Sequence, residues 1–214
     1  MRYYIADNHF WHGRMNKAMD KRGFRDVQDM NEYMIERWNS RVRRNDEVVI
    51  LGDLSIGKAE ETNKILKQLK GKLFMIEGNH DKFLSQKETD FARFQWIKPY
   101  KEIKDNGRKI ICCHYPIVCY NGQFRMKDGK PTTFMLHGHI HRTSDIKGLR
   151  VYKDFVAQYP REIRGKEEKK SAPCQIINCF CMFSDYVPLT LDEWIEIDNA
   201  RVDEASMQED WSYK

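Results

Sequence analysis

The sequence predicts an α/β fold built in layers, and three features of the 214-residue chain indicate it. Short apolar runs recur along the first two thirds of the chain and are bounded by glycine or polar residues, which is typical of buried strands. Longer segments with apolar residues at helical spacing lie between several of these runs. A hairpin signal near the middle of the chain indicates that part of the sheet is antiparallel. Together these features favour strands and helices packed in separate layers around one core.

Five apolar runs are short enough to be strands, and each stops immediately before a polar cluster. Periodicity alone does not distinguish a run of this length from buried helix, but the flanking glycines favour strand. The predicted strands are residues 3–6, 48–51, 73–76, 110–113 and 134–136. Each strand therefore delivers polar residues at its carboxyl end.

Two segments between these strands predict amphipathic helices. The first runs from Val27 to Val42, with apolar residues three or four positions apart and Asp26 placed as its N-cap. The second spans residues 59–70. Gly71 is expected to be its C-terminal cap, because glycine tolerates the left-handed conformation found there.

The later part of the chain contains different signals. The Asp-Asn-Gly sequence at 105–107 predicts a hairpin turn between strands at 100–103 and 109–113. Residues 175–182 predict a further strand. The Thr-Leu-Asp-Glu sequence at 190–193 has the spacing of a capping box and predicts the start of a last helix.

We expect residues 1–214 to form a single domain, because the length and the 41% hydrophobic content suit one core. Residues 161–170 are almost all charged, with both signs mixed, and predict a solvated loop or insertion rather than a domain boundary. Residues 205–214 are polar and predict a frayed tail.

Composition bounds the compartment and the class of partner. The net charge is +5, but 37 basic residues are balanced by 32 acidic ones, which weakly favours anionic substrates and falls short of the signature of a nucleic-acid-binding domain. The amino terminus has no apolar segment typical of a signal peptide, and no run approaches the ~20 apolar residues that span a bilayer. We therefore expect a cytoplasmic protein that is not bound to a membrane, with its six cysteines reduced.

The polar clusters after the predicted strands contain the ligand types of a two-metal site. Asp7 and His9 are two residues apart, so on an extended segment both side chains project to the same face, and His139 and His141 repeat that spacing. Asp53 offers two carboxylate oxygens that could bridge two cations. All seven histidines can be placed around this one candidate site. The clusters are Asp7-Asn8-His9, Gly52-Asp53, Gly78-Asn79-His80-Asp81, His114 and Gly138-His139-Ile140-His141.

Charge balance indicates the reaction that such a site serves. Two divalent cations carry four positive charges, whereas Asp7, Asp53 and one bridging hydroxide return three negative charges. The net positive centre that remains attracts a phosphate oxyanion. Two metals roughly 3.5–4 Å apart activate a water molecule and hold the phosphoryl oxygens during in-line displacement. The ligand set therefore predicts phosphoester hydrolysis.

Taken in order, the five clusters resemble the pattern of the calcineurin-like metallophosphoesterase superfamily, which is D-x-H, GD, GNH followed by D or E, H, and GHxH. The resemblance covers roughly residues 1–142 and continues more loosely through 176–181. It implies a sandwich of two mixed β-sheets flanked by helices, with the site at the carboxyl ends of the strands. It also implies a metal-dependent phosphoesterase in which a metal-bridging hydroxide attacks phosphorus.

The resemblance implies a role for each matching residue. Asp53 bridges two metals, and His80 donates a proton to the leaving oxygen as a general acid. Asp81 beside it is expected to hold or polarise the site. Mixed oxygen and nitrogen ligands suit manganese, which we expect, and also iron, zinc or nickel. The first ion is implied to be held by Asp7, His9, Asp53 and His141, and the second by Asp53, Asn79, His114 and His139.

Within the superfamily the chain resembles the small prokaryotic and phage phosphoesterases and predicted phosphohydrolases. Protein Ser/Thr phosphatases carry an Asp-Arg pair after the GD block, and no arginine follows Asp53 here. Two of the candidate substrate contacts have a plainer interpretation: a supporting or surface role for His12 and a helix-surface charge for Arg14. The lysines at 127–130 are interpreted as part of a solvated hairpin turn. His137 is expected to be structural. The candidate substrate contacts are His12, Arg14, Tyr120 and Arg125.

Three functions remain open at this point. A phosphomonoesterase and a phosphodiesterase are equally consistent with the ligands. Phe10 and Trp11 could stack on a base, which would favour a phosphodiesterase or nuclease acting on nucleotides or single-stranded nucleic acid, or they pack against the sheet. The third function is a non-catalytic scaffold of the same fold. Scaffolds of this superfamily, such as the retromer subunit, have lost metal ligands, whereas every ligand position is filled in this sequence. We expect a phosphorylated small molecule or nucleotide as the partner, with nucleic acid as the alternative and no obligate protein partner.

Overall fold

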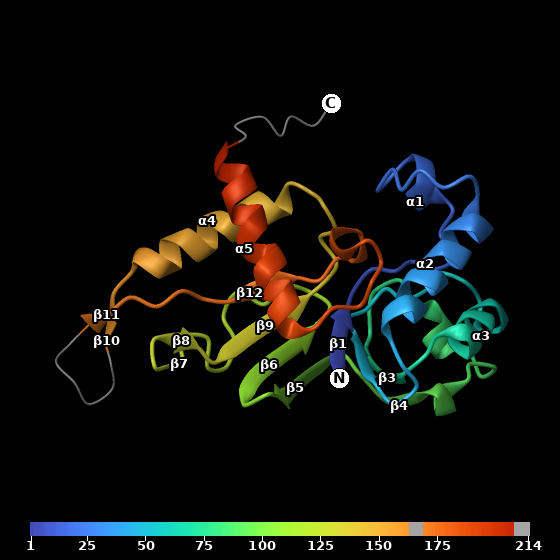
Figure 1. Ribbon diagram of the computed structural model, residues 1–214, viewed down its shortest axis with the longest axis horizontal. Coiled ribbons are helices and arrows are strands. Elements are labelled where there is room, and N and C mark those ends of the chain that lie inside the picture. The colour runs from blue at the N-terminus through green and yellow to red at the C-terminus, as the bar shows by residue number, and fades with distance from the viewer. Residues whose placement is uncertain (163–168, 208–214) are drawn as a thin grey trace.

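The computed structural model describes residues 1–162 and 169–207, which contain two four-stranded sheets and the helices around them (Figure 1). The first sheet has the order β1-β2-β3-β4 and all its pairs are parallel. Its strands are β1 (Arg2–Ile5), β2 (Glu47–Ile50), β3 (Lys72–Ile76) and β4 (Phe94–Lys98). The second sheet has the order β12-β9-β6-β5. Its strands are β5 (Tyr100–Asp105), β6 (Arg108–Cys113), β9 (Thr133–His137) and β12 (Ile176–Asn178).

The second sheet is the mixed one. Strands β12, β9 and β6 are parallel, whereas β5 is antiparallel to β6. The connecting turn places Asn106 and Gly107 at φ 46° and 77°, the left-handed values of the predicted hairpin turn. The predicted α/β fold with two layered sheets is thus confirmed, but only the second sheet is mixed, whereas two mixed sheets were expected.

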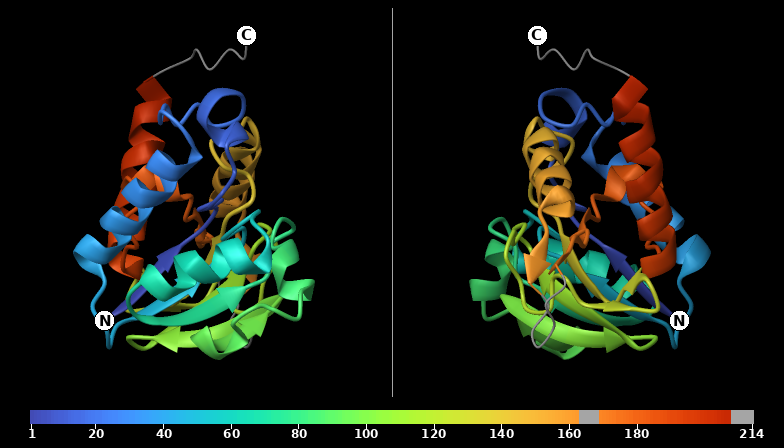
Figure 2. Two further views of the ribbon diagram at one scale, coloured as in Figure 1. Left: turned by 90° about the vertical axis from the view of Figure 1, so that its right-hand side faces the viewer. Right: turned by 90° about the vertical axis from the view of Figure 1, so that its left-hand side faces the viewer.

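Alternation of side chains along the strands builds a core on each side of the first sheet. Tyr3 and Ile5 pack against α2 (Val27–Arg41) and α3 (Ala59–Gln68). Tyr4 faces the other way, into a core shared by the two sheets. A third core lies between the outer face of the second sheet and α4 (Asp145–Gln158). Helix α5 (Leu191–Met207) contributes Trp194 to the core between the sheets, and Figure 2 shows α4 and α5 rising above the strands.

The predicted helix starts are confirmed, and one predicted helix end is wrong. The Asp26 carboxylate accepts hydrogen bonds from the backbone N–H groups of Gln28 and Asp29, as an N-cap does. The Thr190 hydroxyl and the Glu193 carboxylate form the reciprocal bonds of the capping box at α5. Gly71 does not cap α3, which already ends at Gln68. Gly71 has a φ of +96°, and a Cβ atom at this position would lie 2.8 Å from Cγ1 of Val42. Glycine is therefore needed here for close packing.

Several elements differ from the sequence-based expectation. The strand expected over 175–182 is only Ile176–Asn178, because residues 181–184 turn into a 3₁₀ helix, Cys181–Ser184. Strand β4 and helix α4 were not predicted from the sequence. Helix α4 packs Leu149, Tyr152 and Val156 against the third core. It also exposes Val151 and Phe155, so its apolar residues are not confined to the face that packs on the sheet.

The two segments expected to be irregular are partly ordered. Strands β10 (Arg161–Glu162) and β11 (Lys169–Lys170) pair at the two ends of the charged segment, and residues 163–168 lie outside the described residues. Helix α5 continues to Met207, three residues into the expected tail, and residues 208–214 lie outside the described part.

The remaining elements are short. Helix α1 (Arg14–Lys17) follows β1, and the β7 (Met126–Lys127) and β8 (Lys130–Pro131) hairpin precedes β9. Two 3₁₀ helices, Lys82–Ser85 and Phe91–Arg93, connect β3 to β4. The parallel strands of both sheets bring their carboxyl ends to one edge of the molecule, where the polar clusters meet.

Candidate metal centre

Four predicted ligands converge at this edge. Asp7, His9, Asp53 and His141 each offer a ligand atom, and these atoms all lie within 4.8 Å of one another. The first two follow β1, Asp53 follows β2 and His141 follows β9, so residues after three different strands meet in one cluster. The Nε2 atoms of His9 and His141 are 3.1 Å apart. This is the complete ligand set that the resemblance implied for the first ion.

A second group lies on the other side of Asp53. The Asn79 Oδ1 atom is 3.0 Å from His114 Nε2 and 3.0 Å from His139 Nδ1. The Asp53 Oδ2 atom is 3.4 Å from His9 Nε2 and 3.4 Å from His114 Nε2. One carboxylate oxygen is therefore equally close to a ligand of each group.

The donor and acceptor types show that the cluster suits cations. The Nδ1–H of His114 donates to the carbonyl oxygen of Leu51 at 2.9 Å, because a carbonyl only accepts. In the neutral imidazole, Nε2 then carries a lone pair, which faces the oxygens of Asn79 and Asp53. His141 is arranged alike, since its Nδ1 pairs with a carboxylate and leaves Nε2 as an acceptor. Acceptors gathered face to face require a positive charge between them, which metal ions supply.

Two residues that the sequence did not single out hold this cluster from behind. The Asp20 carboxylate accepts from His141 Nδ1 at 2.8 Å and pairs with the Arg22 guanidinium at 2.9 Å. The Arg22 side chain is fully buried and donates to the backbone oxygens of Asn8 at 2.6 Å and Asp7 at 3.0 Å. The pair thereby fixes both the orientation of one ligand and the turn that carries two others. In the sequence it looks like surface charge between two helices.

The ligand loops have an unusual backbone. Positive φ values, which non-glycine residues rarely adopt, occur at most of the predicted ligands. Such strain concentrates at functional sites, where the surrounding structure enforces it. Gly138 shows the closeness of the packing, since a Cβ there would lie 2.6 Å from the Asp7 Oδ2 atom and 2.6 Å from the Ala6 Cβ. The ligands concerned are Asp7, His9, Asp53, His139 and His141.

The chain is similar to known proteins in sequence and in fold. The sequence matches calcineurin-like phosphoesterase over residues 3–187. The chain belongs to this family. An uncharacterized protein of Methanocaldococcus jannaschii, MJ1445, is 31% identical over 192 residues, which cover 89% of this chain and 86% of that protein.

Two solved structures resemble this phosphoesterase family member to different degrees. A protein of unknown function from Aquifex aeolicus, AQ665, aligns with a TM-score of 0.59 at 22% identity and covers 92% of this chain and 98% of that chain. It shares the fold. A Vps29 mutant from Entamoeba histolytica covers 81% of this chain and 73% of that chain, with a TM-score of 0.32 and 17% identity, which is too low to bear on function. The family is metal-dependent, and the Asp and His cluster could bind its metal.

The charged groups of the ligand cluster shift one another's pKa values. Burial raises the pKa of Asp7 to about 6, although His141 and His114 oppose the shift. Burial would also raise the pKa of Asp53, but the hydrogen bond and charge of His114 outweigh it and lower this pKa to about 2. Burial would lower the pKa of His114, yet its contacts with Asp53 and Asp7 raise it to about 9. The raised pKa of His114 thus follows from the two carboxylates that it faces.

Asp81 acts on the loops rather than facing a substrate. Its buried carboxylate accepts hydrogen bonds from the backbone N–H groups of Gly78, Asp53 and Leu54 at 2.8 Å each, and of Ser55 at 3.2 Å. Burial, together with the charge of Asp53, raises its pKa to about 7. Both oxygens are occupied in joining the loop after β2 to the loop after β3. In this position Asp81 holds two ligand-bearing loops, which is one of the two roles expected for it.

Two further histidines lie beside the cluster. The His80 ring centroid is 5.3 Å from that of His9, and the His80 backbone N–H donates to Asp53 Oδ1 at 2.8 Å. His12 is buried, with its Nδ1 3.2 Å from His9 Nδ1 and its ring 6.1 Å from that of His80. Burial, followed by the neighbouring His80, lowers the pKa of His12. The structure thus brings both predicted residues to the same side of the ligand group.

The other candidate substrate contacts are placed differently. Arg14 is exposed on α1, just beyond His12. Tyr120 is buried in the core under α4, and its hydroxyl is hydrogen-bonded to the backbone of Gln175 at 2.8 Å. Arg125 is exposed next to β7, and its carbonyl accepts from Thr132 at the amino end of β9. Tyr120 and Arg125 are therefore not in the site, because the chain after His114 runs back toward the opposite edge of the sheet before β9 begins.

The aromatic residues beside the ligands belong to the scaffold. Phe10 is fully buried in the core between the first sheet and its helices. Trp11 is half-buried and donates its Nε1–H to the carbonyl of Glu61 at 3.1 Å. His137 is also fully buried, as expected, and its Nδ1–H donates to the carbonyl of Gly138 at 2.8 Å. Within the described residues, no helix is long and apolar enough to cross a membrane.

Proposed function

We propose that this chain is a binuclear metal-dependent phosphoester hydrolase. The observation that carries the proposal is the position of Asp53 Oδ2, 3.4 Å from a ligand nitrogen of each group. A carboxylate shared in this way suits a pair of ions that clamp one phosphoryl group. The scaffold alternative is disfavoured, because every family ligand position is occupied by a ligand-type side chain.

The residues divide into two ligand sets around Asp53. Asp7, His9 and His141 would hold one ion with it, whereas Asn79, His114 and His139 would hold the other. When bound, two divalent ions supply Lewis-acid polarisation of a phosphoester and of the water that hydrolyses it. Manganese is the metal that we propose, since the ligands are oxygen and nitrogen without thiolate.

The protein's own groups supply orientation and a proton. We assign His80 as the general acid that protonates the leaving oxygen, because its backbone is fixed to Asp53 and its ring stands beside the ligand cluster. A positioned acid of this kind contributes about 10²–10⁴ in rate. His12 lies next to both His80 and His9, and we assign it to orient the phosphoryl group or the His80 ring.

Turnover of model esters tests the proposal. The manganese-loaded chain is expected to hydrolyse nitrophenyl phosphate, bis-nitrophenyl phosphate or both, and cyclic nucleotides and short single-stranded DNA extend the comparison to biological phosphodiesters. His80→Ala should retain two metals per chain and lose about 10²–10⁴ in kcat. Lys82→Ala, an exposed position two residues away, is the matched control and should leave kcat unchanged.

Two results would overturn the assignment. A chain that binds no manganese, iron, zinc or nickel and turns over none of these esters would be a scaffold instead. Normal turnover by His80→Ala with normal metal content would remove His80 as the general acid while leaving the metal centre in place.

A further inference from the structure

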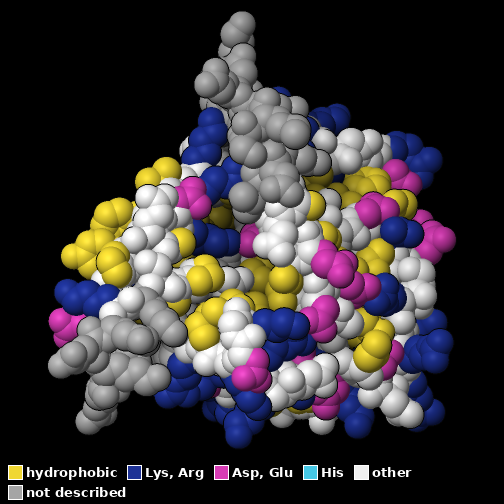
Figure 3. Space-filling view, turned by 60° about the vertical axis from the view of Figure 1, so that its left-hand side comes forward, with side chains coloured by type: hydrophobic (Ala, Val, Ile, Leu, Met, Phe, Trp, Pro, Cys, Tyr) yellow, Lys and Arg dark blue, Asp and Glu magenta, His cyan; other side chains and the backbone are white. Residues whose placement is uncertain are grey.

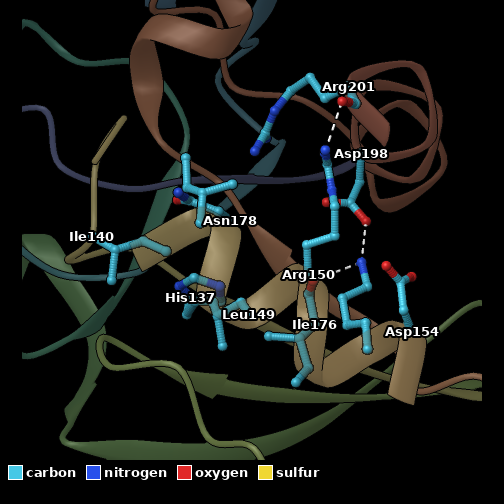
Figure 4. A pocket seen from close by; sticks show the side chains of 11 residues that line it. His137, Ile140, Leu149, Arg150, Asp154, Ile176, Asn178, Asp198 and Arg201 are labelled. Atoms are coloured by element: carbon cyan, nitrogen blue, oxygen red, sulfur yellow. Dashed lines mark hydrogen bonds and ion pairs between the residues drawn. The ribbon is translucent and has the colours of Figure 1, made fainter. Parts of the chain in front are cut away.

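A second polar cavity lies on the reverse side of the loop that carries His139 and His141. It has a volume of about 50 Å³ and opens between α4, α5 and the edge of the second sheet (Figure 4). A cavity of this volume holds a few water molecules or one small multi-oxygen ion. The face in Figure 3 shows lysine and arginine side chains interspersed with apolar ones on this side of the molecule. The polar groups of the lining are His137, Arg150, Lys153, Asp154, Asn178, Asp198 and Arg201.

Two buried polar atoms of this lining have no hydrogen-bond partner among the described residues. One is Nε2 of His137, a fully buried side chain, and the other is Nη1 of Arg201. Because His137 Nδ1 donates to the carbonyl of Gly138, its neutral ring presents Nε2 as an acceptor. Nη1 of the guanidinium is a donor. A ligand that accepts from a cation and also donates to an imidazole nitrogen would therefore satisfy both atoms.

The charges in the cavity favour an anion. Lys153 is paired with Asp198 at 2.6 Å, so one of the two carboxylates in the lining already has a cationic partner. Arg150 donates to the backbone carbonyl of Arg201 at 2.8 Å. No carboxylate in the described part of the chain forms an ion pair with Arg150 or with Arg201. The three cations of the lining, Arg150, Lys153 and Arg201, outnumber its two carboxylates, Asp154 and Asp198, an arrangement that favours an oxyanion.

We propose that this cavity binds a small oxyanion that carries a proton, of the class of hydrogen phosphate. The anionic oxygens accept from Arg201 and Arg150, and the O–H group donates to His137 Nε2. Sulfate has no proton to donate at neutral pH, so it leaves the buried imidazole nitrogen unmatched. Bicarbonate shares the required chemistry, and it forms a separate arm of the test. The proposal uses none of the metal ligands and does not rest on the proposed function.

The cavity is connected to the metal-binding loop by direct bonds. Asn178 lines it and donates from Nδ2 to the carbonyl of His141 at 2.8 Å, and His137 holds the carbonyl of Gly138. Both ends of the loop at 138–141 are therefore fastened to residues of the cavity. An anion bound there stabilises the same conformation of the loop that directs His139 and His141 toward the ligand cluster.

Calorimetric titration of the manganese-loaded chain with inorganic phosphate near pH 7.5 tests the proposal. Two binding events are expected, one at the metal centre and one in the cavity. Arg201→Met and Arg150→Met should each weaken the cavity event about tenfold or more, because a charged hydrogen bond is lost. Arg43→Met, which removes an exposed arginine at the opposite edge, is the matched control and should bind as the unmodified chain does. Asp53→Asn should abolish the metal-centre event and leave the cavity event.

The outcomes separate this site from the metal centre. A cavity event that survives in both arginine variants, or that is missing in the unmodified chain and in Asp53→Asn, overturns the proposal. Sulfate should bind the cavity about tenfold more weakly than phosphate, since a buried acceptor stays unpaired. Equal affinity for the two anions would refute the role given to His137. Bicarbonate binding tighter than phosphate would support the site and identify the smaller anion as its ligand. Circular dichroism verifies that each variant is folded.

Discussion

Replacing Asp20 by asparagine removes one negative charge from the support of the metal centre while keeping the shape of the side chain. In the folded chain this carboxylate accepts from His141 Nδ1 at 2.8 Å and pairs with the buried Arg22 at 2.9 Å. Its pKa is lowered despite burial, because the hydrogen bond and charge of His141 and the charge of Arg22 favour the ionised form. The substitution therefore weakens the basicity of His141, a proposed metal ligand, and leaves Arg22 without its counterion.

The expected effect on metal binding is a 10- to 100-fold loss of affinity, the usual consequence of removing a carboxylate that orients a ligating histidine. Stability should fall as well, because breaking a buried ion pair costs about 3–5 kcal/mol. Arg22 keeps two backbone oxygens as acceptors, so we expect the lower end of that range. At about 2–4 °C per kcal/mol for a chain of this size, the melting temperature of the metal-free protein drops by about 6–12 °C.

Competition against a fluorescent chelator measures the manganese affinity, and calorimetric melting of the chelator-treated protein measures the stability. Asp128→Asn is the matched control, because that aspartate is exposed in a turn at φ 49°, which asparagine also tolerates. The reasoning is refuted if Asp20→Asn binds manganese within twofold of the unmodified chain. A lower melting temperature with unchanged affinity would mean that the residue is only structural.

Three further predictions concern the ligands themselves. Asp53→Asn should weaken both ions together and His9→Ala mainly one, which metal analysis per chain resolves; equal losses in the two variants argue against a bridging carboxylate. Manganese affinity should rise between pH 6 and pH 9, because His114 (pKa about 9) and Asp7 (pKa about 6) must release protons on binding; titrations at several pH values that give one constant affinity would contradict this. Gly138→Ala should destabilise the chain by about 1–3 kcal/mol through overpacking against Ala6 and Asp7; a melting temperature within 1 °C of the unmodified chain would contradict it.

The sequence predicts the ligand side of the site because that side depends on strand ends. A short buried strand is marked by its apolar run, and parallel strands that share a sheet also share an edge for their carboxyl ends. The residues after β1, β2 and β3 therefore had to meet once the sheet was inferred. The second sheet contributes His114 after β6 and His139 and His141 after β9. Their place in the site was predictable only from the family resemblance, through the order of the clusters.

The residues that support the ligands, Asp20 and Arg22, could not be predicted from the sequence for a physical reason. Asp20 and Arg22 lie in an irregular segment between α1 and α2, where side chains follow neither period of regular structure. A charged residue in such a segment is ordinarily solvated, and only tertiary contact shows that the Arg22 side chain is fully buried. Tyr120 and Arg125 failed in the opposite way. They follow His114 closely in the sequence, but the chain reverses direction before β9 and carries them to the opposite edge of the sheet.

Arg22 and Asp81 are needed because of the strained conformation of the ligand loops. Where Asp7 and Asp53 take positive φ, the backbone leaves the strand ladder, and the polar groups that follow need other partners. The turn after β1 directs carbonyl oxygens inward, and the Arg22 cation collects them. The turns after β2 and β3 direct N–H groups inward, and the Asp81 anion collects those. The positive Arg22 thus binds backbone oxygens, which carry partial negative charge, and the negative Asp81 binds backbone N–H groups, which carry partial positive charge. Exchanging either residue for a neutral one should loosen a ligand loop even though the ligands themselves are intact.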